Sequence, residues 1–416
     1  MPSCRCDIIR TMAGEVEEAT APDAAEKMIT REFVLLFVAG FLCMGSLYLL
    51  IPVLPLYMSD VVKASTTQVG LLVGLLTFSS MLFRPFVGRK SDEVGRKVFL
   101  LIGATVFIVA PLLYVPARST WALPFVLLFN GFGIACYHTA SLTFIGEIAP
   151  SSQRGKSQAW FQTSFNLSVM VAPPLAILIK DVFGYNWVFV SASIAGALSL
   201  AISLLINERM APGRPAPAES ALKGPGMRRL LVLVCVGVFA STTTLGTVEA
   251  FLGLFAQAEG IAHFALFFTI SGGLLILIRL AFGGLIDTLG RKLTGFLALA
   301  ALGASMVILA VANGFAMVCV SAIVWGAGFS FASPAFSAML MDCVPHEELG
   351  RAFGIFTAAF EGGIVFGAML MGPVVTALGY RTAFVIIGCV CLAGALFFLT
   401  AYRALSLPIS SPTKLP

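Results

Sequence analysis

The sequence predicts an all-α membrane protein, with twelve transmembrane helices in two pseudo-symmetric bundles of six. Three observations lead to this fold class. Of the 416 residues, 58% are hydrophobic and only 11% are charged. The apolar residues fall into runs of about 20, the length that a helix needs to cross a hydrocarbon core of about 30 Å. Finally, many residues of the first half recur in the second half at one constant offset of 195 positions.

The composition excludes a soluble globular domain, because a soluble chain of this size would carry far more charge on its surface. In the hydrocarbon region no water is available to backbone N–H and C=O groups, so each span must be a helix that satisfies them internally. The expected spans, in chain order, are 33–58, 69–87, 98–115, 122–146, 157–179, 187–206, 230–256, 263–286, 293–312, 315–341, 352–378 and 382–405.

The internal repeat is clearest in a short loop with the pattern Gly-x-x-x-Asp-x-x-Gly-Arg-Lys, which follows the second and the eighth spans. In membrane proteins such duplication usually marks a transporter, with its binding site at the interface between the halves. The first copy contains Gly88, Asp92, Gly95, Arg96 and Lys97, and the second contains Gly283, Asp287, Gly290, Arg291 and Lys292.

The remaining segments are expected outside the membrane. Residues 1–31 lack the pattern of a signal peptide and are interpreted as a cytoplasmic tail. A proline-rich linker, 207–228, is expected between a first bundle, 32–206, and a second, 229–405, and a cytoplasmic tail of 406–416 follows. The nine cysteines are scattered singly, which argues against a disulfide framework or a metal cluster. A metal or a modification on Cys4 and Cys6 is the alternative to a plain tail.

The distribution of basic residues predicts the orientation in the membrane. If the loop after the second span is cytoplasmic, only four of the 26 basic residues lie outside, namely Lys63, Arg118, Lys180 and Arg381. Such an excess marks the cytoplasmic side, so both termini are expected there. The net charge of +5 then reflects topology and contact with anionic lipid headgroups, and it requires no nucleic acid.

The repeated loop contains charges that can stabilise it. Glycines permit a sharp reversal between two helices, and Asp92 can accept hydrogen bonds at a helix start, where the dipole favours an anion. Arg96 can meet a carboxylate, for which Glu147 at the end of the fourth span is available. The second copy offers Asp287, Arg291, Lys292 and Asp342.

This pattern resembles the major facilitator superfamily, over roughly residues 33 to 405, and the repeated motif is that superfamily's most specific signature. The resemblance implies the major facilitator fold. It also implies a cytoplasmic gate, which holds the halves together while the cavity faces outward. The implied gate residues are Gly88, Asp92, Gly95, Arg96 and Glu147, with Asp287, Gly290, Arg291 and Asp342 in the second copy.

Two further stretches resemble small-molecule and multidrug efflux members, namely 51–57 (Ile-Pro-Val-Leu-Pro-Leu-Tyr) and 131–155. The chain departs from those relatives at two positions. Leu127 stands where many have an arginine, and Pro173 follows an alanine where the antiporter signature has a glycine. The usual proton-coupling residue is therefore left unassigned by the resemblance.

Few ionisable side chains fall well inside the expected spans, and these are Glu249, Glu361 and His138. A charge at the bilayer centre costs about 2.5–3.5 kcal/mol on insertion scales, so each needs a polar cavity or a partner. Neutral Glu and His cost less, which suits them to reversible protonation. A structural histidine and a rim position are the alternatives for His138 and Glu249. Arg84 and Arg279 lie near the cytoplasmic ends of their spans and can snorkel.

Glu361 is the leading candidate for proton coupling. It lies nine residues into the eleventh span, which is near mid-membrane at 1.5 Å per residue. Its mate in the repeat is Asn166, which shares a helical face with Gln162. This polar face is expected to line a cavity, or else to join helices by hydrogen bonds. Asn130 lies on the polar face of the fourth span.

The leading functional hypothesis is a proton-driven secondary transporter with alternating access, in which protonation of Glu361 shifts which side is open. Export of a small organic molecule, as an antiporter, is favoured by the resemblance. The alternatives are proton-coupled import of an organic solute and a non-transporting receptor or scaffold. The expected location is the bacterial plasma (inner) membrane, as a monomer. Tyr48 and Phe165 are candidates for contact with an apolar substrate.

The sequence does not indicate an enzyme. It contains no Walker A lysine motif, so ATP-driven pumping is unsupported, and no zinc-type spacing of ligands. No cofactor and no metal are expected. The expected partners are a small organic substrate, H⁺ as the coupling ion and the lipid bilayer.

Overall fold

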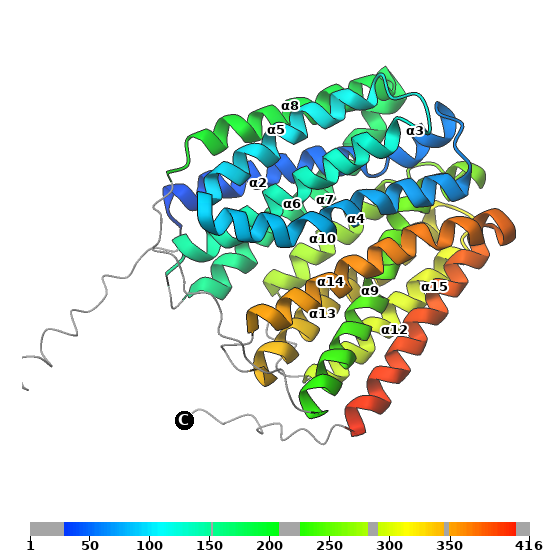
Figure 1. The fold of residues 1–416 in the computed structure, drawn as a ribbon. Coiled ribbons are helices and arrows are strands. Elements are labelled where there is room, and N and C mark those ends of the chain that lie inside the picture. The colour runs from blue at the N-terminus through cyan, green and yellow to red at the C-terminus, as the bar shows by residue number, and fades with distance from the viewer. Residues whose placement is uncertain (1–28, 151–152, 208–224, 282–289, 345–348, 405–416) are drawn as a thin grey trace, which may run out of the picture.

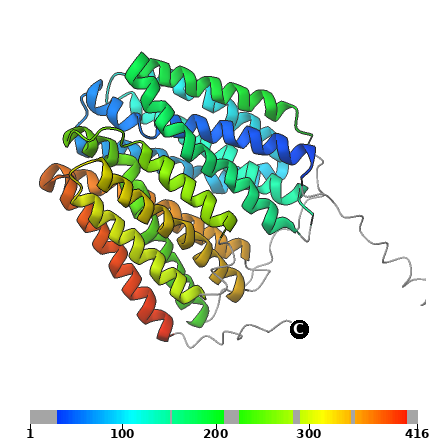
Figure 2. The ribbon, with the colours of Figure 1, turned by 180° about the vertical axis from the view of Figure 1, so that it is seen from behind.

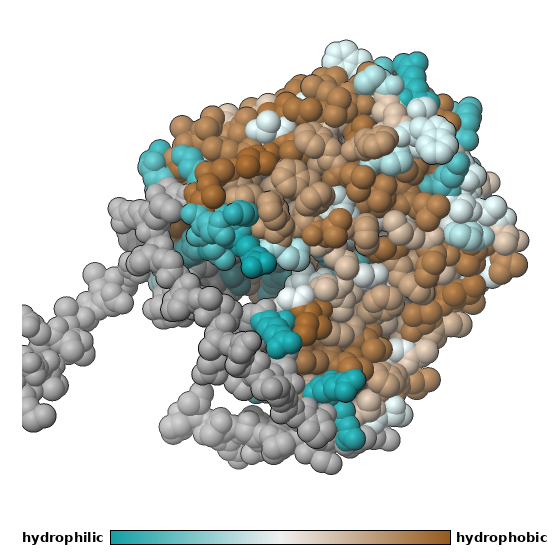
Figure 3. Space-filling view, viewed as in Figure 1, coloured by the Kyte–Doolittle hydropathy of each residue, from teal (hydrophilic) through white to brown (hydrophobic). Residues whose placement is uncertain are grey.

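The computed structural model describes residues 29–150, 153–207, 225–281, 290–344 and 349–404. These residues form helices and short connections, with no β-strand among them. Within the described ranges, eleven helices are long and apolar enough to cross a membrane, and α10 is a shorter apolar helix. Apolar side chains cover the flank of the molecule in Figure 3, and hydrophilic ones gather toward its ends. The predicted all-α membrane fold is confirmed.

The N-terminal bundle begins at Arg31 and its last helix ends at Leu204. Its helices are α2 (Arg31–Leu50), α3 (Leu54–Asp60), α4 (Thr66–Val94), α5 (Arg96–Tyr114), α6 (Leu123–Ile148), α7 (Arg154–Phe183) and α8 (Tyr185–Leu204). The C-terminal bundle follows. Its helices are α9 (Pro225–Ala258), α10 (Leu266–Ala281), α12 (Arg291–Ala310), α13 (Phe315–Cys343), α14 (Leu349–Met369) and α15 (Met371–Ala404).

The first expected span is divided into two helices, α2 and α3. Pro52 and Pro55 have no N–H group and cannot complete the helical hydrogen-bond ladder, so the chain turns between Leu50 and Leu54. Within the turn, the N–H of Val53 donates to the carbonyl oxygen of Leu50 at 3.0 Å.

The eleventh expected span is divided in the same way. α14 ends at Met369, just before Gly372 and Pro373, and the first turns of α15 continue the span. Gly379 then interrupts α15 with a φ of 83° and a ψ of 167°. The part of α15 after Gly379 is the twelfth span.

The repeat seen in the sequence is also present in the backbone. Among the described residues, Gly95 and Gly290 have φ values of 111° and 78°, and Gly184 and Gly379 have values of 88° and 83°. Each pair is separated by 195 positions. With ψ near 150–170°, this conformation is essentially restricted to glycine. Helices in both halves therefore meet at matched glycine corners.

Replacing Gly184 or Gly379 with alanine is expected to lower the free energy of unfolding by about 1–3 kcal/mol each, because a Cβ strains this backbone conformation. Gly314→Ala is the matched control. Gly314 also precedes a helix and has open space around it, but its φ of −177° suits any residue. Thermal denaturation of the purified variants in detergent measures the difference. Equal melting temperatures for Gly184→Ala and Gly314→Ala would contradict the prediction.

The two bundles meet along two symmetric helix pairs, visible in Figures 1 and 2. α4 packs against α14, and α10 packs against α7. α4 and α10 are repeat mates, as are α7 and α14, so the second pair is a copy of the first. The central interface therefore has an approximate two-fold relation.

The bundles touch at one end and spread apart at the other. We define the terminal end as the end where α2 begins and α15 stops, and the distal end as the opposite one, where α3 lies. At the distal end, the Gln257 side chain donates to Asp60 at 3.1 Å and the hydroxyls of Thr67 and Thr376 lie 2.8 Å apart. Toward the terminal end the ribbons diverge (Figure 1), and Figure 3 shows a recess between the bundles.

Candidate functional site

A cavity of about 400 Å³ lies between the two bundles. Its lining comes from helices of both bundles, including α2, α4, α6 and α7 on one side and α9, α10, α13 and α14 on the other. Its wall is largely apolar. The polar and ionisable lining includes Tyr48, Arg84, His138, Gln162, Asn166, Glu249, Arg279 and Glu361.

An ion pair between Arg84 and Glu361 connects the two bundles at this cavity. Nη2 of Arg84, on α4, lies 2.5 Å from Oε1 of Glu361, on α14. Glu361 is only 4% exposed. A carboxylate removed from water to this degree needs an opposite charge or a proton, because desolvation otherwise penalises its ionised form. The protonation state of Glu361 therefore affects a contact between the two bundles.

The sequence analysis identified Glu361 but did not identify its partner. It noted that Arg84 and Arg279 can snorkel to the membrane interface; in the structure both line the cavity, and Arg84 pairs with Glu361. The repeat relates these positions, because Arg84 and Arg279 are mates, as are Glu361 and Asn166, but it does not specify that Arg84 meets Glu361.

The second helix pair differs from the first in its charges. Arg279 occupies on α10 the position of Arg84 on α4, but α7 carries Asn166 where α14 carries Glu361. Nη1 of Arg279 donates to the backbone carbonyl oxygen of Ala159 at 3.3 Å. One interface is thus an ion pair, and its copy is a guanidinium beside neutral groups.

The other predicted ionisable residues, Glu249 and His138, also line the cavity. Glu249 projects from α9. The His138 ring lies 5.4 Å from the Phe165 ring, centroid to centroid, and its Nδ1 is buried without a hydrogen-bond partner. Gln162 and Tyr48 belong to the same lining.

Asn130 lies outside this lining. It is fully buried, and its Nδ2 donates to the hydroxyl oxygen of Tyr114 at 3.2 Å, which joins α6 to α5. This hydrogen bond joins helices of one bundle, and the Oδ1 of the same side chain is buried without a partner.

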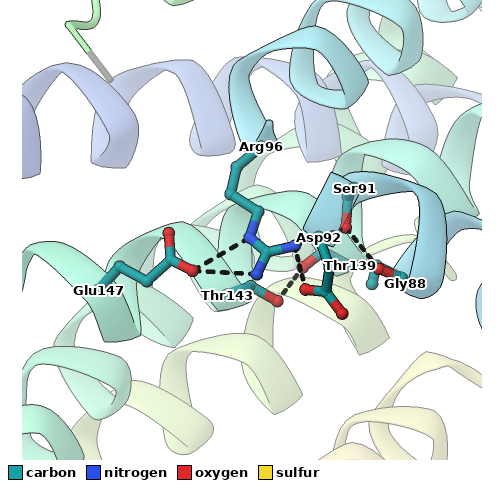
Figure 4. Close-up of polar contacts among 7 residues, drawn as sticks. All are labelled: Gly88, Ser91, Asp92, Arg96, Thr139, Thr143 and Glu147. Atoms are coloured by element: carbon teal, nitrogen blue, oxygen red, sulfur yellow. Dashed lines mark hydrogen bonds and ion pairs between the residues drawn. The ribbon is translucent and has the colours of Figure 1, made fainter. Parts of the chain in front are cut away.

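The first copy of the repeated loop forms a compact charged network at the terminal end (Figure 4). Arg96 donates from Nε and Nη2 to Oε1 of Glu147, at 3.1 and 3.0 Å. Its Nη1 pairs with Asp92 and donates to the hydroxyl of Ser91 at 2.9 Å. Ser91 in turn donates to the carbonyl oxygen of Gly88 at 2.9 Å. The network ties α5 to α4 and α6, so it stabilises the N-terminal bundle itself.

The second copy repeats the main contact. Nε of Arg291 lies 2.7 Å from Oδ2 of Asp342, with the same separation in sequence as Arg96 and Glu147. Gly290 forms the matching corner. Asp287 lies outside the described residues. In the described part of the chain, no cluster of three or more His, Cys, Asp or Glu side chains could hold a metal ion.

Comparison with known proteins identifies the family. The sequence matches the Major Facilitator Superfamily over residues 36–315 and again over 234–414. The chain therefore belongs to this superfamily and is a multi-pass integral membrane protein.

Relatives match most of this chain at low sequence identity. Multidrug resistance protein 2 of Bacillus subtilis is 24% identical over 375 residues, covering 87% of this chain and 93% of that protein. The uncharacterised MFS-type transporter YhhS of Escherichia coli K12 is 25% identical over 357 residues, covering 82% and 84% of the two chains. These relatives are transporters and not enzymes.

Solved structures agree on the fold. A POT family transporter in complex with a thioalcohol-conjugated peptide superposes with a TM-score of 0.77 at 15% identity, covering 91% of this chain and 97% of the other. The nucleoside transporter NupG gives a TM-score of 0.73 at 15% identity, with coverage of 90% and 100%. The predicted two-bundle fold is confirmed.

Proposed function

We propose that the chain is a proton-coupled secondary transporter that exports a small organic molecule by alternating access. The observation that carries the proposal is the Arg84–Glu361 ion pair, which lies on the cavity and joins the two bundles. The similarity to Multidrug resistance protein 2 supports export as the direction.

The excess of basic residues supports a cytoplasmic terminal end. With that orientation, the cavity described here opens toward the cytoplasm, and the distal contacts close it to the outside. The networks around Arg96 and Arg291 then lie on the cytoplasmic face, where we assign them the role of gate. A plasma membrane location in a bacterium and a monomeric state complete the proposal.

Protonation of Glu361 is the step that couples the proton to the conformation. A neutral Glu361 loses the Coulomb attraction that holds α14 to α4, so the free energy of this conformation rises relative to its alternative. Glu249 is a second acid in the same cavity and is proposed as a further proton site. His138, Gln162 and Asn166 are proposed to contact the substrate.

Proton-coupled import is the second candidate, and one observation favours it. Protonating Glu361 frees the positive charge of Arg84, so a proton and a negatively charged solute would reinforce each other's binding. Such positive coupling is what a symporter requires, whereas an exchanger requires proton and solute to bind in turn.

Transport measurements in everted membrane vesicles distinguish proton-coupled export from proton-coupled import. Vesicles with an acidified interior are mixed with a panel of cationic, neutral and anionic organic compounds, and their contents are followed by mass spectrometry. Export in exchange for protons accumulates a compound inside, and symport depletes a preloaded one. If neither flux depends on the pH gradient in vesicles that contain the protein, the proposed coupling is wrong.

A further inference from the structure

Arg279, the cation of the second inter-bundle interface, is the feature that identifies a substrate class. We propose that Arg279 binds the anionic group of an organic substrate, with the Asn166 amide as a second donor. The inference rests on the proposed transport function and names the class of molecule that the same cavity binds. It concerns what binds and leaves the direction of transport to the vesicle experiment.

The symmetry of the cavity is the first support. The α10–α7 pair is a copy of the α4–α14 pair, and Arg279 and Asn166 are the mates of Arg84 and Glu361. In the first pair a carboxylate on the opposite bundle neutralises the guanidinium. In the second pair the chain supplies an amide at that position. A ligand carboxylate would occupy the role that Glu361 has in the first pair.

Arg279 has few partners of its own in this structure. A guanidinium carries five N–H donors, and Arg279 donates from Nη1 to the carbonyl oxygen of Ala159. No carboxylate in the described part of the chain lies within ion-pair distance of it. The other acid in the lining, Glu249, is on α9 and does not pair with it. Arg279 is partly buried in the cavity wall, and a charge-assisted hydrogen bond to an anion would use the donors that the Ala159 carbonyl leaves over.

Buried polar atoms without partners lie in the same lining. Nδ2 of Asn166 and Nδ1 of His138 are buried and have no hydrogen-bond partner. Unsatisfied buried groups of this kind cost free energy and call for a ligand or for water. The Asn166 amide can only donate from this atom, and a carboxylate oxygen only accepts, so the two are complementary.

The remaining lining residues of the cavity indicate the chemistry of the uncharged part of the ligand. Phe165, Phe329, Phe356 and Phe360 line the cavity, together with Tyr48. Aromatic walls favour an apolar or aromatic skeleton. The cavity of about 400 Å³ is much larger than a small inorganic anion requires. The class is therefore an amphipathic organic anion, with one carboxylate on an apolar body.

Binding of 1-naphthoate to the purified protein in detergent tests the proposal, with 1-naphthamide and 1-naphthylmethylamine as the neutral and cationic analogues. Titration calorimetry is expected to show 1-naphthoate binding at least about tenfold more tightly than 1-naphthamide. Arg279→Gln is expected to remove this preference. If the wild type prefers neither the anion nor its amide, the proposal is wrong.

Asn166→Glu is the sharper variant, because it keeps Arg279 and restores the carboxylate that the first interface possesses. It should also abolish the preference for 1-naphthoate. Asn166→Gln, its neutral control, moves the amide donor and should weaken 1-naphthoate binding, but it adds no charge beside Arg279 and should keep the preference for the anion over 1-naphthamide. If the only role of Arg279 is its hydrogen bond to the carbonyl oxygen of Ala159, Asn166→Glu leaves the affinity for 1-naphthoate unchanged, and the proposal is wrong.

Glu361→Gln separates this inference from proton coupling. It frees Arg84, so affinity for 1-naphthoate should rise while proton-coupled transport is lost. A preference for the anion in a protein that shows no proton-dependent flux would overturn the coupling and leave the anion site standing. Proton-dependent flux without any preference for the anion would overturn the anion site and leave the proton coupling standing.

Discussion

Glu361→Gln is expected to reduce pH-gradient-driven transport to the background of empty vesicles. Gln has the shape of Glu but cannot gain or lose a proton, so the Arg84 contact no longer responds to pH. Transport down a substrate gradient, which needs no proton, should persist. The comparison of driven and downhill flux in the same vesicles is the measurement. Driven transport at the wild-type rate would show that Glu361 is not the coupling group.

The same substitution also tests the energetic role of the ion pair. Removing one partner leaves Arg84 without its anion, and we expect a loss of about 1–3 kcal/mol in the free energy of unfolding. This value is below the range for a fully buried pair, because 21% of the Arg84 side chain is exposed. Arg84→Met combined with Glu361→Gln is the control, since it removes both charges. It should regain stability without regaining proton coupling.

The large features of the fold could be predicted from the sequence because they depend on local properties of the chain. Hydrophobic length fixes the spans, and the repeat fixes the number of bundles. The match of Arg96 with Glu147 was also predictable, because both residues lie at the ends of spans on the same side of the membrane.

The pairing of Arg84 with Glu361 was not predictable in the same way. These residues lie on different bundles, and no local pattern specifies the rotation and depth at which α4 meets α14. The position of Asn130 was also not predictable from the sequence. From the sequence, a polar residue on the fourth span could face a cavity or form a hydrogen bond with a neighbouring helix. The structure shows the second arrangement, in which Asn130 donates to Tyr114.

The breaks in the first and eleventh spans were missed for another reason. Hydrophobicity continues through Pro52 and through Leu370, so a count of apolar residues registers one long span in each case. The backbone is interrupted because prolines lack an N–H group, a property that hydropathy does not measure. Both breaks lie toward the distal end, beside the contacts that close it.

Gly70→Leu is expected to force the distal end open. Gly70, on α4, lies so close to the C-terminal bundle that a Cβ there would be 2.5 Å from the carbonyl oxygen of Ala368 and 3.1 Å from Cα of Gly372. Both obstacles are backbone atoms and cannot rotate away. Overpacking of about 1–3 kcal/mol changes the ratio of the two conformations by about 5- to 150-fold. The protein should therefore favour the state in which the bundles separate at this end.

Spin labels at Arg118 and Ala262, exposed residues in distal loops of the two bundles, report this change as a longer distance in pulsed electron paramagnetic resonance. Gly354→Leu is the matched control, because Gly354 lies on α14 with open space around it. If Gly70→Leu leaves the distance unchanged and merely lowers the melting temperature, the distal contact belongs to a rigid core and the bundles do not separate there. A longer distance with transport arrested indicates instead that closing of the distal contact is an obligatory step of the cycle.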